Sequence, residues 1–221
     1  MLGGMGAVYV TSHPDLMVPW AAPAIRAFCE RAVARGVRRV VRRVVLLSGR
    51  GEPAAAVSER VVRASGAEWT VLRASWFFQN FSEDFLLGLV LDGEIALPAG
   101  EVAEPFVDAD EVTEVAVVAL TTDALAGRTV ELTSPRLLTF AGVAAEISSA
   151  TGRDVHYRPV SARELVRLAT ASDEAAVLAE LFTRVLDGRN SAVTADVARV
   201  LGRPARDFAD YARAAAGAWA R

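Results

Sequence analysis

The chain has 221 residues, of which 52% are hydrophobic and 23% are charged, a composition typical of a folded globular protein and not of a disordered one. Its formal net charge of −3 gives no electrostatic basis for binding nucleic acid. All 24 basic residues are arginine, so no lysine is available to act as a base or to form a Schiff base.

Few residues could hold a metal or direct the chain to a membrane. Cys29 is the single cysteine, which excludes an intramolecular disulfide and a cysteine-based zinc site. His13 and His156 are too few and too far apart in sequence to indicate a metal cluster. The first 25 residues lack a signal-peptide pattern, and no apolar run is long enough to span a bilayer. We therefore expect a cytoplasmic protein with a small-molecule substrate and without a metal, nucleic-acid or membrane partner.

Apolar runs alternate with helical periodicity in the first third of the chain. Strands are predicted at residues 6–10, 40–48 and 69–73, and helices at residues 19–35 and 53–65. The continuous apolar end of the second strand, VVLLSGRG, suits a parallel strand that is covered on both faces. Consecutive strand–helix–strand units of this kind predict an α/β fold with a doubly wound parallel sheet.

Helices become more frequent in the remainder. We expect helices at residues 76–90, 108 onward, 139–151 and from 162 to the end, with short strands at 95–97, 128–132 and 155–158. Ser161 and Glu164 have the spacing of a capping box, as do Asp108 and Glu111, for which capping is preferred over catalysis. The expected layout is a sheet core at 1–135 and a mostly helical region at 136–221.

An aromatic and amide cluster follows the third predicted strand. Residues 69–81 read WTVLRASWFFQNF, which places Gln79 and Asn80 among four aromatic rings. Ligands of open parallel sheets bind at the carboxyl ends of the strands. A flat, apolar and hydrogen-bonding surface there suits a planar organic molecule. Periodicity alone favours the rings as core residues, but a buried amide without partners costs about 1–3 kcal/mol, which shifts the balance toward a pocket.

Longer motifs carry a family resemblance over nearly the whole chain. VVLLSGRGE, WTVLRASWFFQNFSEDF, LPAG, PFVDADEVTEVA and ELTSPRLLTFAGVAAEISSATGR occur in this order. Together they resemble the NmrA-like branch of the atypical short-chain dehydrogenase/reductases, which includes NAD(P)H-dependent quinone reductases and non-catalytic redox-sensing regulators. The resemblance implies a Rossmann domain that binds NADP or NAD and a smaller carboxyl-terminal region that closes over the substrate.

The same resemblance implies which residues form the site. The residues that would bind the cofactor are Val10, Thr11, Ser12, Ser48 and Gly49. Those that would bind the substrate are Trp76, Phe77, Gln79, Asn80 and Phe106. The resemblance assigns no catalytic side chain and no metal ligand.

One part of the family pattern is missing from the sequence. Family members begin with a strand, a glycine-rich turn and a helix whose backbone N–H groups hold the pyrophosphate. Here Gly3, Gly4 and Gly6 precede the first predicted strand, and the segment Gly49-x-Gly51 has only two glycines. We therefore expect a truncated Rossmann-like core that binds its cofactor weakly.

The truncation would leave the strand at 6–10 as an uncharged sheet edge, and such edges are usually covered. A second copy of the chain would cover this edge in a homodimer, or another polypeptide would. Alternatively, the chain is a fragment of a longer reading frame.

These expectations leave three functions open. The first is an NAD(P)H-dependent reductase of a quinone or similar small conjugated carbonyl, impaired by the missing turn. The second is a non-catalytic redox sensor or interaction module that keeps the pocket, and the third is an inactive fragment. The sequence specifies neither the substrate nor the choice between NAD and NADP.

Overall fold

The structure is a computed structural model that describes residues 6–12, 16, 18–33, 42–168 and 182–220. The chain forms two compact units. Unit 1 comprises residues 1–74, 110–132 and 196–203, and unit 2 comprises residues 75–109, 133–195 and 204–221. The units are therefore not consecutive stretches of chain, because residues 75–109 fold with the carboxyl-terminal part. The functional division into 1–135 and 136–221 stays a prediction.

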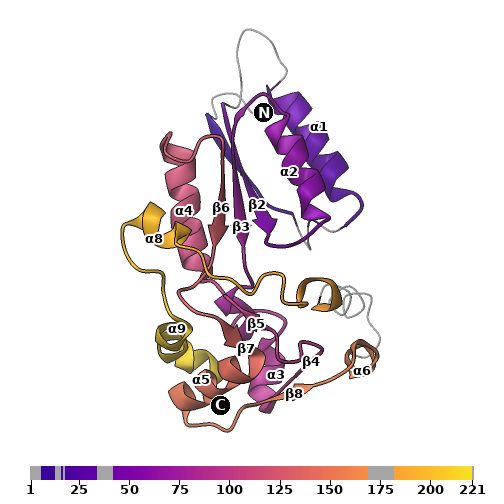
Figure 1. The fold of residues 1–221 in the computed structure, drawn as a ribbon, viewed down its shortest axis with the longest axis vertical. Coiled ribbons are helices and arrows are strands. Elements are labelled where there is room, and N and C mark those ends of the chain that lie inside the picture. The colour runs from indigo at the N-terminus through magenta and orange to yellow at the C-terminus, as the bar shows by residue number, and fades with distance from the viewer. Residues whose placement is uncertain (1–5, 13–15, 17, 34–41, 169–181, 221) are drawn as a thin grey trace. The chain divides into compact units, whose positions relative to one another are not determined.

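Unit 1 contains a four-stranded parallel sheet in the order β1-β2-β3-β6 (Figure 1). The strands are β1 (Ala7–Val10), β2 (Arg43–Gly49), β3 (Glu68–Ala74) and β6 (Arg128–Leu132). Val44, Val45 and Leu46 are fully buried, as expected for a strand covered on both faces. The predicted parallel α/β sheet is confirmed, and β1 is the edge strand of the described sheet.

Helices lie on both sides of this sheet (Figure 1). They are α1 (Ala21–Val33) and α2 (Ala55–Arg63) on one side and α4 (Ala109–Thr121) on the other; α8 (Asp196–Leu201) contacts β6. Ile25 of α1 and Val62 of α2 pack with Val44 and Leu46 in one apolar cluster. This arrangement is the doubly wound layering that the alternating pattern predicts.

Unit 2 combines short strand pairs with helices around an aromatic core. Strand β4 (Glu94–Leu97) pairs in parallel with β8 (His156–Pro159), and β5 (Ala103–Glu104) pairs antiparallel with β7 (Leu138–Thr139). The helices are α3 (Leu87–Asp92), α5 (Phe140–Thr151), α6 (Ala162–Leu168), α9 (Phe208–Ala215), and the 3₁₀ helices η1 (Phe78–Phe81) and η2 (Ala216–Trp219). Within the described residues, no helix has both the length and the apolar character needed to cross a membrane.

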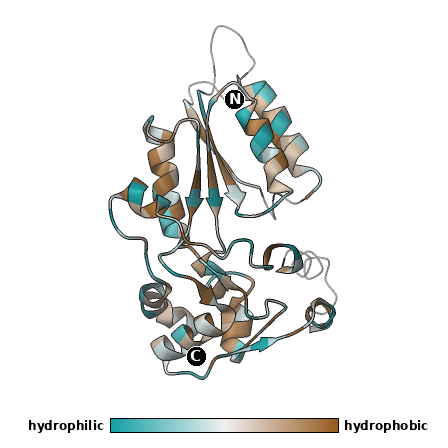
Figure 2. Ribbon diagram, viewed as in Figure 1, coloured by the Kyte–Doolittle hydropathy of each residue, from teal (hydrophilic) through white to brown (hydrophobic). Residues whose placement is uncertain are grey.

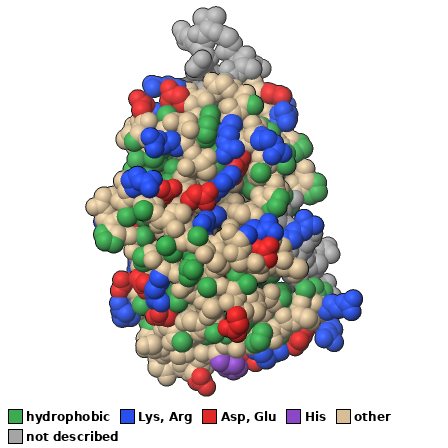
Figure 3. All heavy atoms as spheres, in the orientation of Figure 1, with side chains coloured by type: hydrophobic (Ala, Val, Ile, Leu, Met, Phe, Trp, Pro, Cys, Tyr) green, Lys and Arg blue, Asp and Glu red, His purple; other side chains and the backbone are tan. Residues whose placement is uncertain are grey.

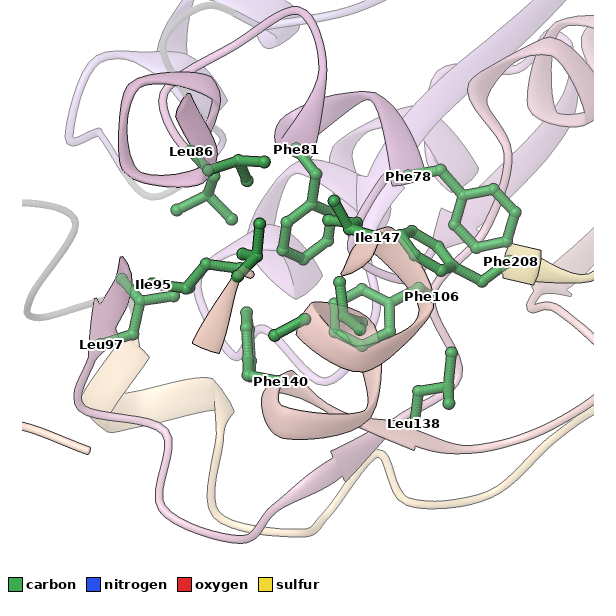
Figure 4. Packing of buried hydrophobic residues seen from close by; sticks show 14 of the residues in the cluster. Phe78, Phe81, Leu86, Ile95, Leu97, Phe106, Leu138, Phe140, Ile147 and Phe208 are labelled. Carbon is green, nitrogen blue, oxygen red and sulfur yellow. The ribbon is translucent and has the colours of Figure 1, made fainter. Parts of the chain in front are cut away.

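The core of unit 2 is built around Phe81. Its ring contacts those of Phe106, Phe140 and Phe208 at centroid distances of 5.5 to 6.0 Å (Figure 4). The buried indole of Trp219 donates a 2.8 Å hydrogen bond to the Phe81 carbonyl. Aromatic pairs in such tilted or edge-on arrangements contribute about 0.5–1.5 kcal/mol each beyond their area burial. These rings therefore fix the segment after β3 against the carboxyl-terminal helices.

The prediction of one helix over residues 76–90 is wrong. Phe77 is extended, with φ −76° and ψ 142°, and forms a parallel bridge with Val107. The Phe78 N–H donates to the Val107 carbonyl and the Val107 N–H donates to the Trp76 carbonyl, both at 2.9 Å. These tertiary hydrogen bonds replace the first helical turn, so only a short 3₁₀ helix follows, and α3 begins nine residues later than η1. Periodicity cannot detect a backbone partner from a distant segment.

Other expected boundaries agree with the structure. Helix α5 follows Thr139, whose side chain accepts a hydrogen bond from the Gly142 N–H at 3.0 Å. It ends at Gly152, which has a φ of 70° that a residue with a Cβ rarely adopts. At α6 the Ser161 hydroxyl accepts from the Glu164 N–H at 3.2 Å, which is one half of the predicted capping box.

Candidate functional site

The residues expected to bind the cofactor lie at one end of the unit 1 sheet. Val10 is the last residue of β1 and pairs with Leu46 of β2, so residues 10–12 and 48–49 leave neighbouring parallel strands at the same end. Carboxyl ends of parallel strands are where open α/β sheets bind ligands. The structure thus brings the five residues together, while their contact with a cofactor stays a prediction.

Polar side chains gather at this carboxyl end, where Figure 2 shows β3 and β6 turning hydrophilic. Ser48, Arg73 and Glu131 lie side by side in register on β2, β3 and β6. Arg73 donates to both oxygens of Glu59, at 2.8 and 2.7 Å, and to Glu131 at 2.9 Å. Ser48 donates its hydroxyl proton to Glu59 at 2.8 Å. Ser48 is therefore held by the protein and can offer a ligand only its oxygen lone pairs.

Glu59 is the centre of this network and is only 1% exposed. Burial alone would raise the pKa of its carboxyl, but hydrogen bonds from Arg73 and Ser48, and the charges of Arg73 and Arg63, hold the pKa below its ordinary value. Glu59 is thus a carboxylate whose charge is neutralised by its neighbours. It anchors α2 to the sheet and is not a candidate acid or base.

A steric contact explains why a glycine stands at position 49. A Cβ at this position would lie 1.9 Å from the Glu52 Oε1 atom, so the Glu52 carboxylate occupies the space that a side chain would need. Any larger residue would have to displace Glu52. The glycine therefore leaves room for the Glu52 carboxylate, whereas the turn after β2 uses the positive φ of 71° at Gly51.

The residues expected to bind the substrate belong to unit 2. Trp76 is partly buried and stacks on Phe182, with ring centroids 5.0 Å apart and planes inclined by 5°. Phe77 is half-buried beside it in the chain. Stacked aromatic rings with partial exposure provide a flat apolar surface of the kind that planar ligands contact.

Both polar atoms of the Gln79 side chain form hydrogen bonds with the protein. Its amide nitrogen donates to Asp108 at 2.7 Å, and its amide oxygen accepts from the Ala109 N–H, the first residue of α4, at 2.9 Å. The other oxygen of Asp108 accepts from Arg206 at 2.7 Å. Gln79 therefore closes the helix start, and its role in substrate binding stays a prediction that would require these bonds to change.

Asn80 differs from its neighbour. The residue is 7% exposed, and within the part of the chain that the structure describes its side-chain amide forms no hydrogen bond. The amide atoms are not among the fully buried side-chain atoms that lack a partner, so they keep some exposure to solvent. A ligand that presents a carbonyl or hydroxyl group to Asn80 would satisfy it.

Phe106 lies in the core of unit 2. It is 1% exposed and packs edge-on against Phe81 and Phe140 (Figure 4). Its carbonyl accepts a 2.8 Å hydrogen bond from the Ser134 N–H. The ring therefore supports the segment that carries Trp76 and Asn80, while its expected place at the pocket wall stays a prediction.

Sequence reasoning missed three residues of this region. Phe182 is the only aromatic residue between Tyr157 and Phe208, and this isolation is the one signal that could have singled it out. Arg206 is one of 24 arginines, and nothing in the sequence marks its bond to Asp108. The Ser75 hydroxyl is buried and has no hydrogen-bond partner, which only tertiary packing reveals. Across the described residues, no cluster of His, Cys, Asp and Glu could hold a metal ion.

Two curated proteins are similar in sequence to this chain. An oxidoreductase of Bacillus subtilis, YesF, is 33% identical over 217 residues, which are 96% of this chain and 75% of that protein. Agroclavine dehydrogenase of Claviceps fusiformis is 30% identical over 94% of this chain and 73% of its own length. No protein-family model matches the chain.

Solved structures show the same fold. The NADPH-dependent quinone oxidoreductase of Escherichia coli, solved with NADPH, superimposes with a TM-score of 0.80 and 19% sequence identity. The match covers 96% of this chain and 76% of that structure. The fold is therefore that of Rossmann-like reductases.

Proposed function

Because the chain belongs to the NmrA-like branch of the atypical short-chain dehydrogenase/reductases, we propose that it is an NAD(P)H-dependent oxidoreductase of a small, flat, conjugated carbonyl compound such as a quinone. The names of both curated relatives, an oxidoreductase and a dehydrogenase, support the reaction class. The substrate class follows from the family resemblance and from the side chains of unit 2.

The Asn80 amide carries the proposal. Its N–H groups and carbonyl form no hydrogen bond within the described residues, whereas the adjacent Gln79 amide is bound to Asp108 and Ala109. A quinone oxygen would accept a hydrogen bond from Asn80, and negative charge that develops on this oxygen during reduction would strengthen that bond. Trp76, supported from behind by Phe182, would offer its ring to the flat face of the substrate.

The chain's own residues would bind and orient the substrate and would exclude water. No arginine, carboxylate or tyrosine needs to act as a general base or acid, because a quinone that has received a hydride from the nicotinamide would need only one proton, which solvent can supply. This division of work agrees with a site that has no assigned catalytic side chain.

The described residues fit one half of a nicotinamide dinucleotide. Residues 10–12 and 48–49 share the carboxyl end of a parallel sheet and would hold the nicotinamide half, which supplies a hydride when it is bound. The pyrophosphate half has no matching glycine turn between a strand and a helix in this sequence.

Two measurements test the reductase proposal. Titration of the protein with NADPH should quench tryptophan fluorescence, because Trp76 would lie beside the bound nicotinamide. Consumption of NADPH should then depend on added menadione, and Asn80→Ala should lower kcat/KM by about tenfold. Absence of menadione-dependent oxidation at saturating NADPH would refute the reductase.

A non-catalytic redox sensor is the second candidate. The family resemblance supports it, because the NmrA-like branch includes non-catalytic redox-sensing regulators. The two functions differ in the same assays: a sensor shows fluorescence quenching by NADPH without menadione-dependent oxidation.

We also propose that a second copy of the chain covers the β1 edge. In the described sheet β1 pairs with β2 only, and its sequence AVYV carries no charge that would keep another strand away. Sedimentation velocity should therefore show a dimer, whereas a monomer at all concentrations would contradict this arrangement.

A further inference from the structure

A groove of about 870 Å³ opens on unit 2 between α6 and residues 183–184. Among the described residues, its lining includes Arg163, Arg167 and Arg184 and no acidic residue. Figure 3 shows basic side chains projecting at the edge where Figure 1 places α6. Ligand pockets commonly measure about 300–1,000 Å³, so the groove is large enough for a small organic molecule.

Helix α6 presents two kinds of side chain to the groove. Arg163 and Arg167 are four residues apart and therefore share one face of the helix. Ala162 and Val166 form the neighbouring row with the same spacing and also line the groove. The helix thus offers two guanidinium groups beside an aliphatic strip.

The opposite wall is anchored in the core of unit 2. Phe182 and Val185 are buried, and Phe182 stacks on Trp76, whereas Thr183 and Arg184 between them are exposed. The buried residues on each side hold the exposed pair in place. Thr183 on this wall therefore directly follows Phe182, whose ring supports Trp76.

No described residue neutralises the charges of Arg163 and Arg167. Within the described residues neither arginine forms an ion pair, whereas Glu164, on the same helix, accepts a 2.8 Å hydrogen bond from Arg158. Like charges repel when they share one groove. An anion between the two guanidinium groups would remove this repulsion, and the planar forks of arginine match phosphate oxygens.

We propose that this groove binds the phosphate group of a small phosphorylated organic molecule. Arg163 and Arg167 donate to the phosphate oxygens, and Ala162 and Val166 contact the apolar part of the ligand. A phosphate monoester carries a charge of about −1.5 to −2 at neutral pH and three acceptor oxygens, which suits two guanidinium groups better than a single carboxylate does. The site is independent of the reductase proposal, because no step of it involves a nicotinamide.

The test measures binding of phenyl phosphate, inorganic phosphate and benzoate to the full chain by isothermal titration calorimetry without nicotinamide. Phenyl phosphate should bind tightest, because it alone combines the doubly charged group with an apolar ring. The double variant Arg163→Gln/Arg167→Gln should bind it about tenfold more weakly, and added salt should weaken binding to the wild type.

A matched control removes the same charge elsewhere. Arg26 and Arg60 are exposed residues of α1 and α2 in unit 1, so Arg26→Gln/Arg60→Gln should leave phenyl phosphate binding unchanged. All four substituted arginines are exposed, and circular dichroism should show both variants folded. Three results would each overturn the proposal: no saturable binding of phenyl phosphate to the wild type, equal losses in the two double variants, or benzoate binding as tightly as phenyl phosphate.

Discussion

Substitution by alanine should affect the stability of the protein differently at two adjacent amides of unit 2, Gln79 and Asn80. Gln79→Ala removes the 2.7 Å bond to Asp108 and the 2.9 Å bond from the Ala109 N–H. Asp108 is 1% exposed and would keep Arg206 as a partner for its other oxygen. Asn80→Ala removes an amide that has no hydrogen bond within the described residues.

The expected magnitudes follow from these contacts. Gln79→Ala loses two hydrogen bonds of about 0.5–1.5 kcal/mol each and leaves a buried carboxylate oxygen and the first N–H of α4 less well satisfied, for a total of about 2–4 kcal/mol. Asn80→Ala breaks no hydrogen bond within the described residues, so only the packing of a largely buried side chain is lost. We therefore expect the free energy of unfolding of Asn80→Ala to lie within about 1 kcal/mol of the wild type.

Urea denaturation followed by tryptophan fluorescence measures both values. The midpoint should fall clearly for Gln79→Ala and remain near that of the wild type for Asn80→Ala. Menadione reduction should show the reverse order for protein that is folded, with the larger loss of kcat/KM in Asn80→Ala. The reasoning is refuted if Asn80→Ala destabilises the protein as much as Gln79→Ala, because Asn80 would then have a structural partner.

Three further outcomes follow from the ion pairs and the aromatic stack. Glu59→Gln leaves Arg73 without its buried partner and should lower the free energy of unfolding by about 3 kcal/mol, as denaturation at neutral pH would show; a change below about 1 kcal/mol would contradict the network. Since the pKa of Glu59 is held below its ordinary value of 4.5, its contribution is complete above that pH and is lost as the pH falls through the lower folded value. The difference between wild type and Glu59→Gln should therefore shrink in acid, and a constant difference would exclude ionised Glu59 as its source. Phe182→Leu removes the ring behind Trp76, so the fluorescence change on adding NADPH should diminish while the protein remains folded; an unchanged titration would show that the stack does not position Trp76.

Local sequence patterns predicted the elements that depend on local interactions. Alternation of short apolar runs with helical periodicity gave the parallel sheet of unit 1, because a strand buried on both faces must be apolar throughout. Thr139 and Gly152 marked the ends of α5, because capping bonds and a positive φ restrict which residues can stand there. The parallel direction of the strands was enough to predict at which end of the sheet residues 10–12 and 48–49 lie.

Long-range contacts decided what the aromatic and amide residues do. The bridge of Phe77 with Val107 replaced the expected helix, and the stack of Trp76 on Phe182 joins residues that are more than a hundred positions apart. No periodicity encodes such pairs, since they form only when the chain packs.

The sequence by itself determined that this chain folds as a parallel α/β reductase-like protein, because burial and capping leave periodic and residue-specific marks along the chain. Only the tertiary structure decided that Gln79 is bound to Asp108 and Ala109 while Asn80 remains unused. The two side chains carry the same amide group, and their chemistry differs solely through the partners that packing brings within reach.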